Sequence, residues 1–544
     1  MRPLAEWKLW AALCFGLLIG LVNVAKPVHV DDALYLNIAR RIVTHPLDPF
    51  GGILNWQQIP EPTYNVSISP PLLSYWFAMV MIVAGENIPL LHLSMIPWLL
   101  LACWGVFRLG ERWANAGLLT VLLVIGGPAV VVGLNLMLDV PLLACMCASV
   151  EFLARIETTR TPVRMLALAS AFAAIGVGIK MPALALVPVF LVASLTTRRW
   201  GPALAALGPL LALVCWQTIS RSIYGTSQVN AGLSFLAKLQ TSLLPQTIER
   251  ILTMMVILAT TFPLWLATPW RSRRAIGQAL IAGLATATAA WLLRSTPMNR
   301  LTEVTPAFLG AVFLGTFSVA AIVWPGRPWT LKSFDPRLWL AAWIVSGAAV
   351  VILFGPFVAV RSFLPIHPPL AIWLIGGFDP VRPRRAALWF TVALTLLLSI
   401  LLAATDLHWA SCYPRAVREI AARFGGSNRP IDFLGHWGWQ YYAERAGFRP
   451  WDARRIDAPA GTIVVIPYRA DKQWINPMVV SRFRPVDEIT ISRSALRFTT
   501  WNRESGFRFY GGDFGQLPWG FSNEPTERFS IYEIEPQMGF NNRR

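Results

Sequence analysis

The sequence predicts a polytopic α-helical membrane protein that ends in an extracytoplasmic α/β domain. Hydrophobic residues make up 55% of the 544 residues and charged residues only 14%, a balance more apolar than that of soluble domains. Apolar runs long enough to cross a bilayer as helices follow one another up to residue 405. The remaining residues, 406–544, are polar, rich in aromatic side chains and patterned like strands.

About thirteen apolar runs are candidate membrane spans. They are residues 9–27, 90–107, 116–134, 140–156, 165–179, 182–196, 201–219, 251–270, 275–293, 303–324, 338–359, 363–377 and 386–405. The first run lacks a small-residue cleavage site, which favours an uncleaved signal anchor. Five of the six cysteines lie inside apolar runs, so a disulfide framework is excluded.

Basic residues set the expected orientation. With the N-terminus inside, 18 basic residues before position 406 fall in cytoplasmic loops and 10 on the other side, as the positive-inside rule requires. This assignment requires that the apolar stretch Pro70–Ala84, which begins with two prolines, lies on or dips into the outer leaflet without crossing. The first outer loop, 28–89, is then the longest, and the C-terminal domain lies outside.

Charged residues of both signs gather on this outer face. The adjacent acids Asp31 and Asp32 open the first outer loop, and Asp139 lies between the third and fourth spans. Lys180 lies between the fifth and sixth spans, and Arg361 follows the eleventh. Acids at a membrane edge tend to face water, a partner or a substrate, because a charge in the bilayer is costly.

Each of these residues also has an ordinary structural interpretation. A single Asp or Lys at a helix end is more often a cap or a snorkelling side chain than a catalytic group. His29, His45, Asp48 and Glu61 are potential metal ligands in the first loop, but their spacing matches no zinc pattern, and we favour solvated loop residues.

The order of five short segments resembles a known family. These segments are 30–39 (VDDALYLNIA), 69–76 (SPPLLSYW), 138–141 (LDVP), 178–182 (GIKMP) and 361–365 (RSFLP). Together they look like the polytopic GT-C glycosyltransferases, and in particular family 39 proteins related to protein O-mannosyltransferases and to the aminoarabinose transferases that modify lipid A. The resemblance covers residues 9–400, so that residues 1–405 would form a GT-C transmembrane domain.

The resemblance implies transfer of a sugar from a polyprenyl-phosphate donor to an extracytoplasmic acceptor, which is a lipid, a glycan or a protein hydroxyl. Asp31 matches the acid that takes the acceptor proton, and Asp139 matches a second acid of the family. Asp32, next to Asp31, is a further catalytic-site candidate that would act through acceptor positioning or as a helix cap. Lys180 and Arg361 match cations expected near the donor phosphate. Tyr35, in the first segment, is a further substrate-binding candidate.

Three positions depart from the family pattern. Ser69 stands where many relatives have His or Lys, Met181 replaces a Gly, and Ser362 replaces a Tyr. The metal-binding Glu of the aminoarabinose enzymes has no counterpart beside Pro70. We therefore predict no metal ligand and no certain cofactor, and leave a divalent cation as an alternative.

The chemistry of these residue types fits the same reaction. A sugar phosphate leaves as an anion, which Lys or Arg stabilises as its charge grows in the transition state. A carboxylate activates a hydroxyl by removing its proton. Base and cations on opposite sides of the sugar predict one direct, inverting displacement without a covalent enzyme intermediate.

The C-terminal residues 406–544 predict a soluble α/β domain. Residues 431–435, 461–467 and 529–533 have the pattern of strands, and 436–446 that of a helix. The aromatic segment 435–442 suits sugar stacking, but an amphipathic helix packed into a small core is the better interpretation. With 19 basic and 15 acidic residues, the domain does not suggest nucleic acid as a partner.

Two other classes of protein stay open. A secondary transporter or flippase for a lipid or sugar would also have many spans, but the charged residues cluster at one face and the halves show no repeat. A noncatalytic envelope scaffold is the third candidate. The sequence contains no nucleotide-binding glycine motif. Orientation and anionic membrane lipids account for the net charge of +18.

Overall fold

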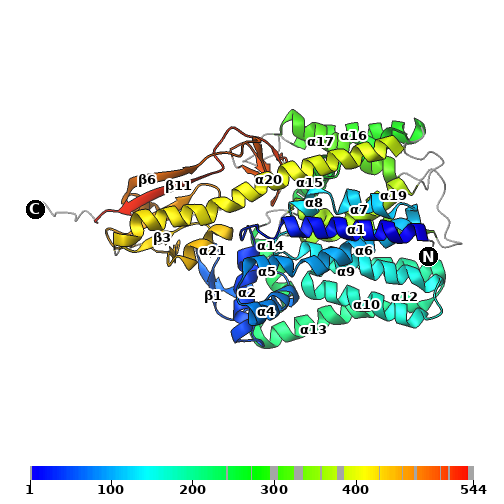
Figure 1. Cartoon of the computed structure of the whole chain (residues 1–544), viewed down its shortest axis with the longest axis horizontal. Coiled ribbons are helices and arrows are strands. Elements are labelled where there is room, and N and C mark those ends of the chain that lie inside the picture. The colour runs from blue at the N-terminus through cyan, green and yellow to red at the C-terminus, as the bar shows by residue number, and fades with distance from the viewer. Residues whose placement is uncertain are drawn as a thin grey trace, which may run out of the picture.

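The computed structural model is an elongated molecule in which a bundle of helices continues into a smaller domain built on a β-sheet (Figure 1). The N-terminus lies at the end of the bundle farthest from this domain. The structure describes residues 3–239, 243–270, 273–293, 304–323, 335–355, 358–376, 385–427, 429–455, 457–470, 475–502, 504–511 and 515–536.

The bundle contains long helices, short helices and 3-10 turns. In chain order they are α1 (Pro3–Val22), α6 (Ile96–Ala114), α7 (Gly117–Val124), α8 (Pro128–Val131), α9 (Asp139–Ala154), η1 (Arg155–Glu157), α10 (Pro162–Ile179), η2 (Met181–Ala185), α11 (Leu186–Thr197), α12 (Trp200–Ala205), α13 (Leu207–Tyr224), α14 (Gln228–Leu239), α15 (Leu243–Thr261), η3 (Leu264–Trp270), α16 (Arg273–Leu293), α17 (Pro306–Val323), α18 (Pro336–Phe354), η4 (Val360–Ile366), α19 (His367–Ile375) and α20 (Arg385–Phe424).

The predicted multi-span helical fold is confirmed. Each predicted run overlaps one helix or consecutive helices. Within the described residues, seven helices are long and apolar enough to cross a membrane, and three more apolar helices are shorter. The number of spans stays a prediction. Of the basic residues assigned to the cytoplasmic side, Arg2, Arg271, Arg327, Lys332, Arg382 and Arg384 lie outside the described residues.

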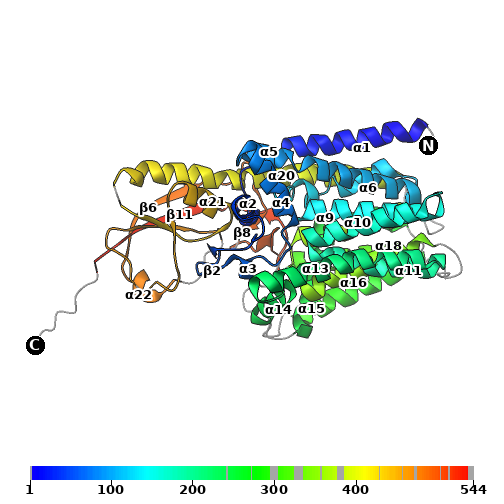
Figure 2. The ribbon, with the colours of Figure 1, turned by 90° about the horizontal axis from the view of Figure 1, so that it is seen from below.

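The first outer loop folds into short elements at the end of the bundle nearest the sheet domain (Figure 2). They are α2 (Asp32–Thr44), β1 (Ile53–Asn55), β2 (Pro60–Pro62), α3 (Thr63–Val66), α4 (Leu72–Ala84) and α5 (Ile88–Leu93). Helix α4 has 13 residues and is therefore about 20 Å long, shorter than a hydrocarbon core of about 30 Å. Its exposed side carries Met79, Ile82 and Val83. This length and surface fit the predicted position in the outer leaflet.

The C-terminal domain is an α/β unit, as predicted. Its strands are β3 (Ile431–Phe433), β4 (Arg449–Pro450), β5 (Ile463–Pro467), β6 (Phe483–Ile491) and β11 (Glu527–Ile534), in the sheet order β4-β3-β5-β11-β6. Strand β3 is parallel to β4 and β5, whereas β11 is antiparallel to β5 and β6. The domain also contains the helices α21 (Trp437–Arg445) and α22 (Pro477–Val480) and the short 3-10 turn η5 (Gly425–Ser427). Two small strand pairs complete it, β7 (Phe498–Thr499) with β10 (Gly520–Phe521) and β8 (Trp501–Asn502) with β9 (Phe507–Arg508).

Helix α20 joins the two parts. Its 40 residues run without a break through positions 405 and 406, where the sequence suggests a domain boundary (Figure 1). The second half of α20 packs its buried side chains, among them Trp409, Tyr413 and Ile420, against the sheet domain and the first outer loop. Bundle and domain therefore share one hydrophobic core.

The aromatic segment of α21 belongs to this core. Trp439 is fully buried, and the exposed fractions of Trp437 and Tyr441 are 7% and 4%. Trp439 donates its indole N–H to the carbonyl oxygen of Leu434 at 2.8 Å. The packing interpretation of this segment is confirmed, because these rings have no free face on which a sugar could stack.

Candidate active site

Four charged side chains form one row where the bundle meets the C-terminal domain. Lys180 Nζ lies 2.7 Å from Asp139 Oδ1, and Asp139 Oδ2 lies 3.5 Å from Arg361 Nε. Arg361 Nη2 then donates to Asp31 Oδ2 at 2.5 Å. The order cation, acid, cation, acid leaves the row close to neutral. We call Lys180, Asp139, Arg361 and Asp31 the charged row.

Breaks between helices place the members of the row. Helix α10 ends at Ile179, and Lys180 has an extended backbone because Pro182 prevents the helix from continuing. Asp139 is the first residue of α9, where a carboxylate is favoured by the helix dipole. Arg361 is the second residue of the 3-10 helix η4, which begins after the break that follows α18.

A strained residue precedes Asp31. Val30 has a φ of 45°, in the left-handed region that a β-branched side chain rarely adopts. This turn sets the direction in which the chain enters α2, with Asp31 as its N-cap residue. Asp31 makes no side-chain capping bond in α2, so its carboxylate is directed to Arg361. Strain of this kind is common at functional sites and costs about 1–3 kcal/mol.

The row has an outer and an inner pair. The side chains of Asp31 and Lys180 are 20% and 24% exposed, whereas those of Arg361 and Asp139 are 7% and 6% exposed. Tyr35, one helical turn after Asp31, is half-buried and feels the charges of Asp31, Arg361 and Asp139. Burial raises the pKa of Tyr35 far above its usual value, so its hydroxyl stays protonated and can donate a hydrogen bond.

Asp32 is not part of the charged row. Its side chain is fully buried, and Oδ2 accepts a hydrogen bond from the backbone N–H of His29 at 3.0 Å. Burial raises the pKa of Asp32 to about 8, against the opposing effect of the backbone N–H of His29 and the charge of Lys26. The structure therefore brings together Asp31, Tyr35, Asp139, Lys180 and Arg361, and separates Asp32 from them.

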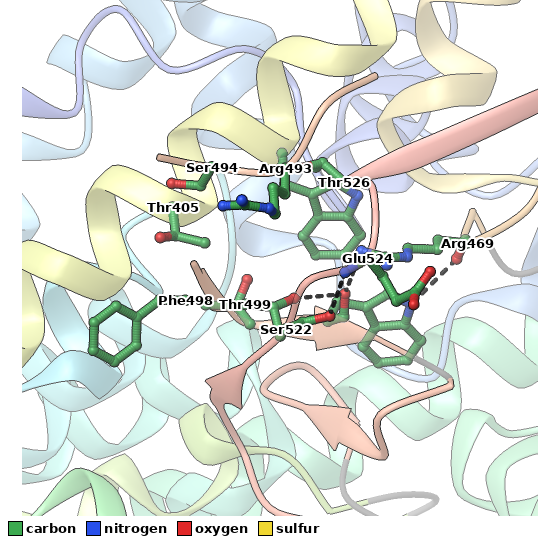
Figure 3. Close-up of a pocket in the computed structure, with 12 residues that line it drawn as sticks. Thr405, Arg469, Arg493, Ser494, Phe498, Thr499, Ser522, Glu524 and Thr526 are labelled. Carbon is green, nitrogen blue, oxygen red and sulfur yellow. Dashed lines mark hydrogen bonds between the residues drawn. The ribbon is translucent and has the colours of Figure 1, made fainter. Parts of the chain in front are cut away.

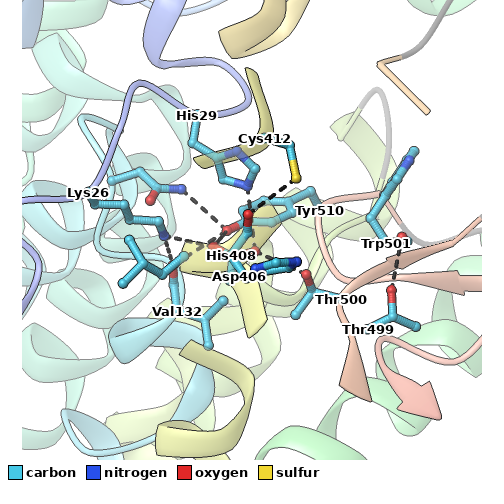
Figure 4. A network of polar contacts seen from close by, with 12 residues as sticks. Lys26, His29, Val132, Asp406, His408, Cys412, Thr499, Thr500, Trp501 and Tyr510 are labelled. Carbon is cyan, nitrogen blue, oxygen red and sulfur yellow. Dashed lines mark hydrogen bonds and ion pairs between the residues drawn. The ribbon is translucent and has the colours of Figure 1, made fainter. Parts of the chain in front are cut away.

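A second polar network lies behind the row, and our sequence analysis did not predict it (Figure 4). Lys26 Nζ lies 2.7 Å from Asp406 Oδ2, and both side chains are almost completely buried. Lys26 also donates to the carbonyl oxygen of Val132 at 2.9 Å. Asp406 accepts hydrogen bonds from the hydroxyls of Tyr510 at 2.7 Å and Thr500 at 3.0 Å. The only sequence signal is that Lys26 and Asp406 stand at the ends of the first and last apolar runs.

His29 completes this second network. Its Nε2 lies 3.5 Å from Asp406 Oδ1, and its ring packs edge-on against Trp409 with a centroid distance of 4.5 Å. Burial lowers the pKa of His29, so the ring is neutral. Within the described part of the chain, no group of three or more His, Cys, Asp or Glu side chains is arranged to hold a metal ion. His29 contacts Asp406 and Asp48 pairs with Arg41, so the first-loop metal alternative gains no geometric support.

A small pocket lies between α20 and the C-terminal domain (Figure 3). Its walls include Thr405 and Trp409 of α20 together with Arg469, Arg493 and Glu524 of the domain. The enclosed space is about 10 Å³, which is enough for one water molecule. This pocket is too small for a sugar. The charged row, which brings acids and cations together, is the candidate active site.

One family model matches part of the chain. Residues 69–221 match the model described as dolichyl-phosphate-mannose-protein mannosyltransferase. The matched segment includes Asp139 and Lys180. Asp31 precedes it and Arg361 follows it. The match agrees with the resemblance inferred from the motifs over this part of the chain, which contains the segments 69–76, 138–141 and 178–182.

Two solved structures are similar at a distance. ArnT from Cupriavidus metallidurans in the apo state has 14% identity and a TM-score of 0.43, and the alignment covers 98% of this chain and 100% of that protein. The oligosaccharyltransferase of Archaeoglobus fulgidus, solved with zinc and sulfate, has 12% identity and a TM-score of 0.41, with coverage of 81% and 62%. No curated protein matches the sequence significantly.

Proposed function

We propose that this protein is an inverting GT-C glycosyltransferase that moves a sugar from a polyprenyl-phosphate donor to a hydroxyl acceptor outside the cytoplasmic membrane. The observation that carries the proposal is the charged row. Lys180 and Arg361 both contact Asp139, which therefore holds close together two cations of the kind that bind phosphate. Asp31 stands next to this phosphate position with part of its side chain open to solvent.

Donor binding would release the base. In the free protein the carboxylate of Asp31 accepts a hydrogen bond from Arg361 and is therefore directed to the guanidinium. A donor phosphate competes for the same guanidinium, since phosphate forms strong charge-assisted bonds with Arg. Asp31 then loses its partner and becomes available to the acceptor hydroxyl. In this scheme the acceptor is activated only when the donor is in place.

The reaction is a single displacement at the anomeric carbon. The acceptor oxygen forms a bond to this carbon and passes its proton to Asp31. The bond from the anomeric carbon to the phosphate oxygen breaks, and the polyprenyl phosphate leaves with the bonding electrons. Lys180 and Arg361 stabilise the charge that grows on the leaving phosphate, and Tyr35 can donate a hydrogen bond to the bound substrate.

An apolar groove next to the row supports a lipid-linked donor. It has a volume of about 360 Å³ and lies between the segment η2–α11 and helix α18. Element η2 begins directly after Lys180, and α18 packs against η4, which carries Arg361. The groove walls are apolar side chains such as Leu184, Pro188, Val345 and Phe354. A polyprenyl chain in this groove would bring its phosphate towards the two cations.

We further propose a multi-pass position in the cytoplasmic membrane, with the charged row and the C-terminal domain outside. The positive-inside distribution supports this orientation. Helices α2 and α4 lie at the end of the bundle that adjoins the domain (Figure 2). Asp31 precedes α2 directly, and ion pairs join it to the other members of the row. Membrane lipids would surround the bundle, while the acceptor would reach Asp31 from the aqueous side.

Transfer by the purified full-length protein tests the proposal. Polyprenyl-phosphate sugars extracted from the membranes of a deletion strain serve as donor, and the envelope of that strain serves as acceptor. Release of polyprenyl phosphate and gain of one sugar are measured together. Asp31→Asn should lower both by roughly 10²- to 10⁴-fold. Asp335→Asn, at an Asp–Arg pair at the far end of α18, should retain both. A wild-type protein that releases no polyprenyl phosphate from the extract contradicts the proposal.

A further inference from the structure

A short segment of the C-terminal domain, Phe509–Tyr510, contacts the charged row. The ring of Tyr510 faces the guanidinium of Arg361, with Arg361 Cζ 5.8 Å from the ring centroid. The backbone N–H of Val360, next to Arg361, donates to the carbonyl oxygen of Phe509 at 3.2 Å. The domain thus contacts both the side chain of Arg361 and the turn that carries it.

The hydroxyl of Tyr510 is anchored on the opposite side of the ring. It donates to Asp406 Oδ2, and Asp406 is held by Lys26 and Thr500 (Figure 4). These groups come from the end of the first span, from α20 and from the domain itself. The buried network therefore fixes the position of the hydroxyl. The ring itself packs against His29 and Trp409, with centroid distances of 5.4 and 6.1 Å, which limits its rotation.

The other neighbours of Arg361 explain why the position of this ring matters. Its guanidinium contacts the carboxylates of Asp31 and Asp139 and the sulfur of Met137. When a donor phosphate displaces Asp31, the guanidinium loses one of its charged partners. A cation close to an aromatic face remains attracted to it whatever anion it binds. Tyr510 can therefore hold the guanidinium in one place through this exchange.

We propose that Tyr510 is a positioning residue of the donor site and that the C-terminal domain completes this site by holding Arg361 against the ring. This inference rests on the proposed function. It gives the domain a direct role in donor recognition, although the domain contributes no member of the charged row. Phe509 supports the same turn through its carbonyl group.

Substitution of the ring should weaken donor recognition and spare the acceptor. Tyr510→Leu should raise the donor KM about 2- to 30-fold, the range that corresponds to one cation–π contact. The acceptor KM, and kcat at saturating donor, should change less than about twofold, because the base and the leaving-group cations remain. Tyr510→Phe keeps the ring face and should restore most of the loss. The matched control is Tyr532→Leu on β11, where the ring packs against Phe483 away from the row.

A graded series separates a cation–π role from a purely structural one. Singly, doubly and triply fluorinated phenylalanine at position 510 have nearly the same shape but a progressively weaker negative ring face. Relative to Tyr510→Phe, the donor KM should rise step by step along the series. This series also decides the matter if Tyr510→Leu fails to fold, as thermal unfolding would show.

Binding of polyprenyl phosphate alone, measured without acceptor, is the second readout, with Arg361→Ala as reference. Weaker binding in both Arg361→Ala and Tyr510→Leu supports the inference. Weaker binding in Arg361→Ala with unchanged binding in Tyr510→Leu and a flat fluorination series overturns it and leaves the proposed function intact. Unchanged binding in Arg361→Ala overturns the proposed function itself.

Discussion

The carboxylate of Asp31 and the guanidinium of Arg361 form an ion pair of 2.5 Å although the two residues stand 330 positions apart. The pair joins the start of the first outer loop to the turn after the eleventh predicted span. Because Asp139 and Lys180 extend the pair into the charged row, residues from four separate segments of the chain meet at one position.

The two cations should act on the donor. Lys180→Ala and Arg361→Ala should each raise the donor KM and lower kcat, because the phosphate is bound in the ground state and carries more charge in the transition state. Arg361→Lys should restore little, since an ammonium cannot replace the planar guanidinium that bridges two carboxylates and faces Tyr510. Steady-state rates at varied donor concentration measure these effects. Wild-type kinetics in both alanine variants would contradict the proposed phosphate-binding role of Lys180 and Arg361.

The adjacent acids Asp31 and Asp32 should not be interchangeable. Asp31→Asn keeps the shape of the side chain but cannot accept a proton, so transfer should fall by roughly 10²- to 10⁴-fold. Asp32→Asn should retain most of the activity, because Asp32 is buried behind the row. Initial rates at saturating donor decide between them. An inactive Asp32→Asn variant beside an active Asp31→Asn variant would reverse the assignment.

Asp32 should instead influence stability as a function of pH. Its pKa in the folded protein is raised to about 8, above the unfolded value, so the folded state binds the proton more tightly. The unfolding free energy contributed by Asp32 therefore falls as the pH rises from about 4 to about 8, and stays low above that range. Asn is neutral at every pH and removes this dependence. Asp32→Asn and wild type should unfold at similar temperatures near pH 4, and the variant should be the more stable at about pH 8.5. Equal melting temperatures at both pH values would contradict the buried, neutral Asp32.

The buried pair Lys26–Asp406 should be strongly coupled. Lys26→Met leaves Asp406 without its cation in a buried site, which should cost about 3–5 kcal/mol of unfolding free energy. The double variant Lys26→Met/Asp406→Asn removes both charges and keeps one amide oxygen as an acceptor, where Asp406 accepts from Thr500 at Oδ1 and from Tyr510 at Oδ2. Its loss should be smaller than the sum of the two single losses. A double-mutant cycle of thermal stability measures the coupling, and additive losses would show that the two charges act independently.

The orientation can be checked with single cysteines. Met478→Cys lies on the surface of the C-terminal domain, and Val163→Cys lies at the start of α10, at the opposite end of the bundle. The exposed native residues Cys14 and Cys215 are replaced first. A membrane-impermeant maleimide should label Met478→Cys in intact spheroplasts, and Val163→Cys only after permeabilisation. The reverse pattern would invert the topology.

The sequence was sufficient for the parts of the site that depend on local order. Motif segments placed Asp31, Asp139, Lys180 and Arg361 at helix ends, and the alternation of basic loops placed those ends on one face. The prolines after Asp139 and Lys180 and the break before Arg361 are local features, and each was visible without a structure. The same holds for the strands β3, β5 and β11, whose patterns depend on neighbouring residues.

Only the tertiary structure decided which charges pair and which polar groups are buried. Asp31 and Asp32 are adjacent residues of the same type. The turn at Val30 and the packing of α2 direct Asp31 to Arg361 and bury Asp32. Lys26 and Asp406 stand 380 positions apart in the numbering of the chain, and no periodic pattern links them. Tyr510 reaches Arg361 because α20 continues from the bundle into the C-terminal domain, which adjoins the end of the bundle (Figure 1). Local patterns encode helices and their ends, since those depend on near neighbours, whereas the burial of a charge depends on surfaces that distant segments bring together.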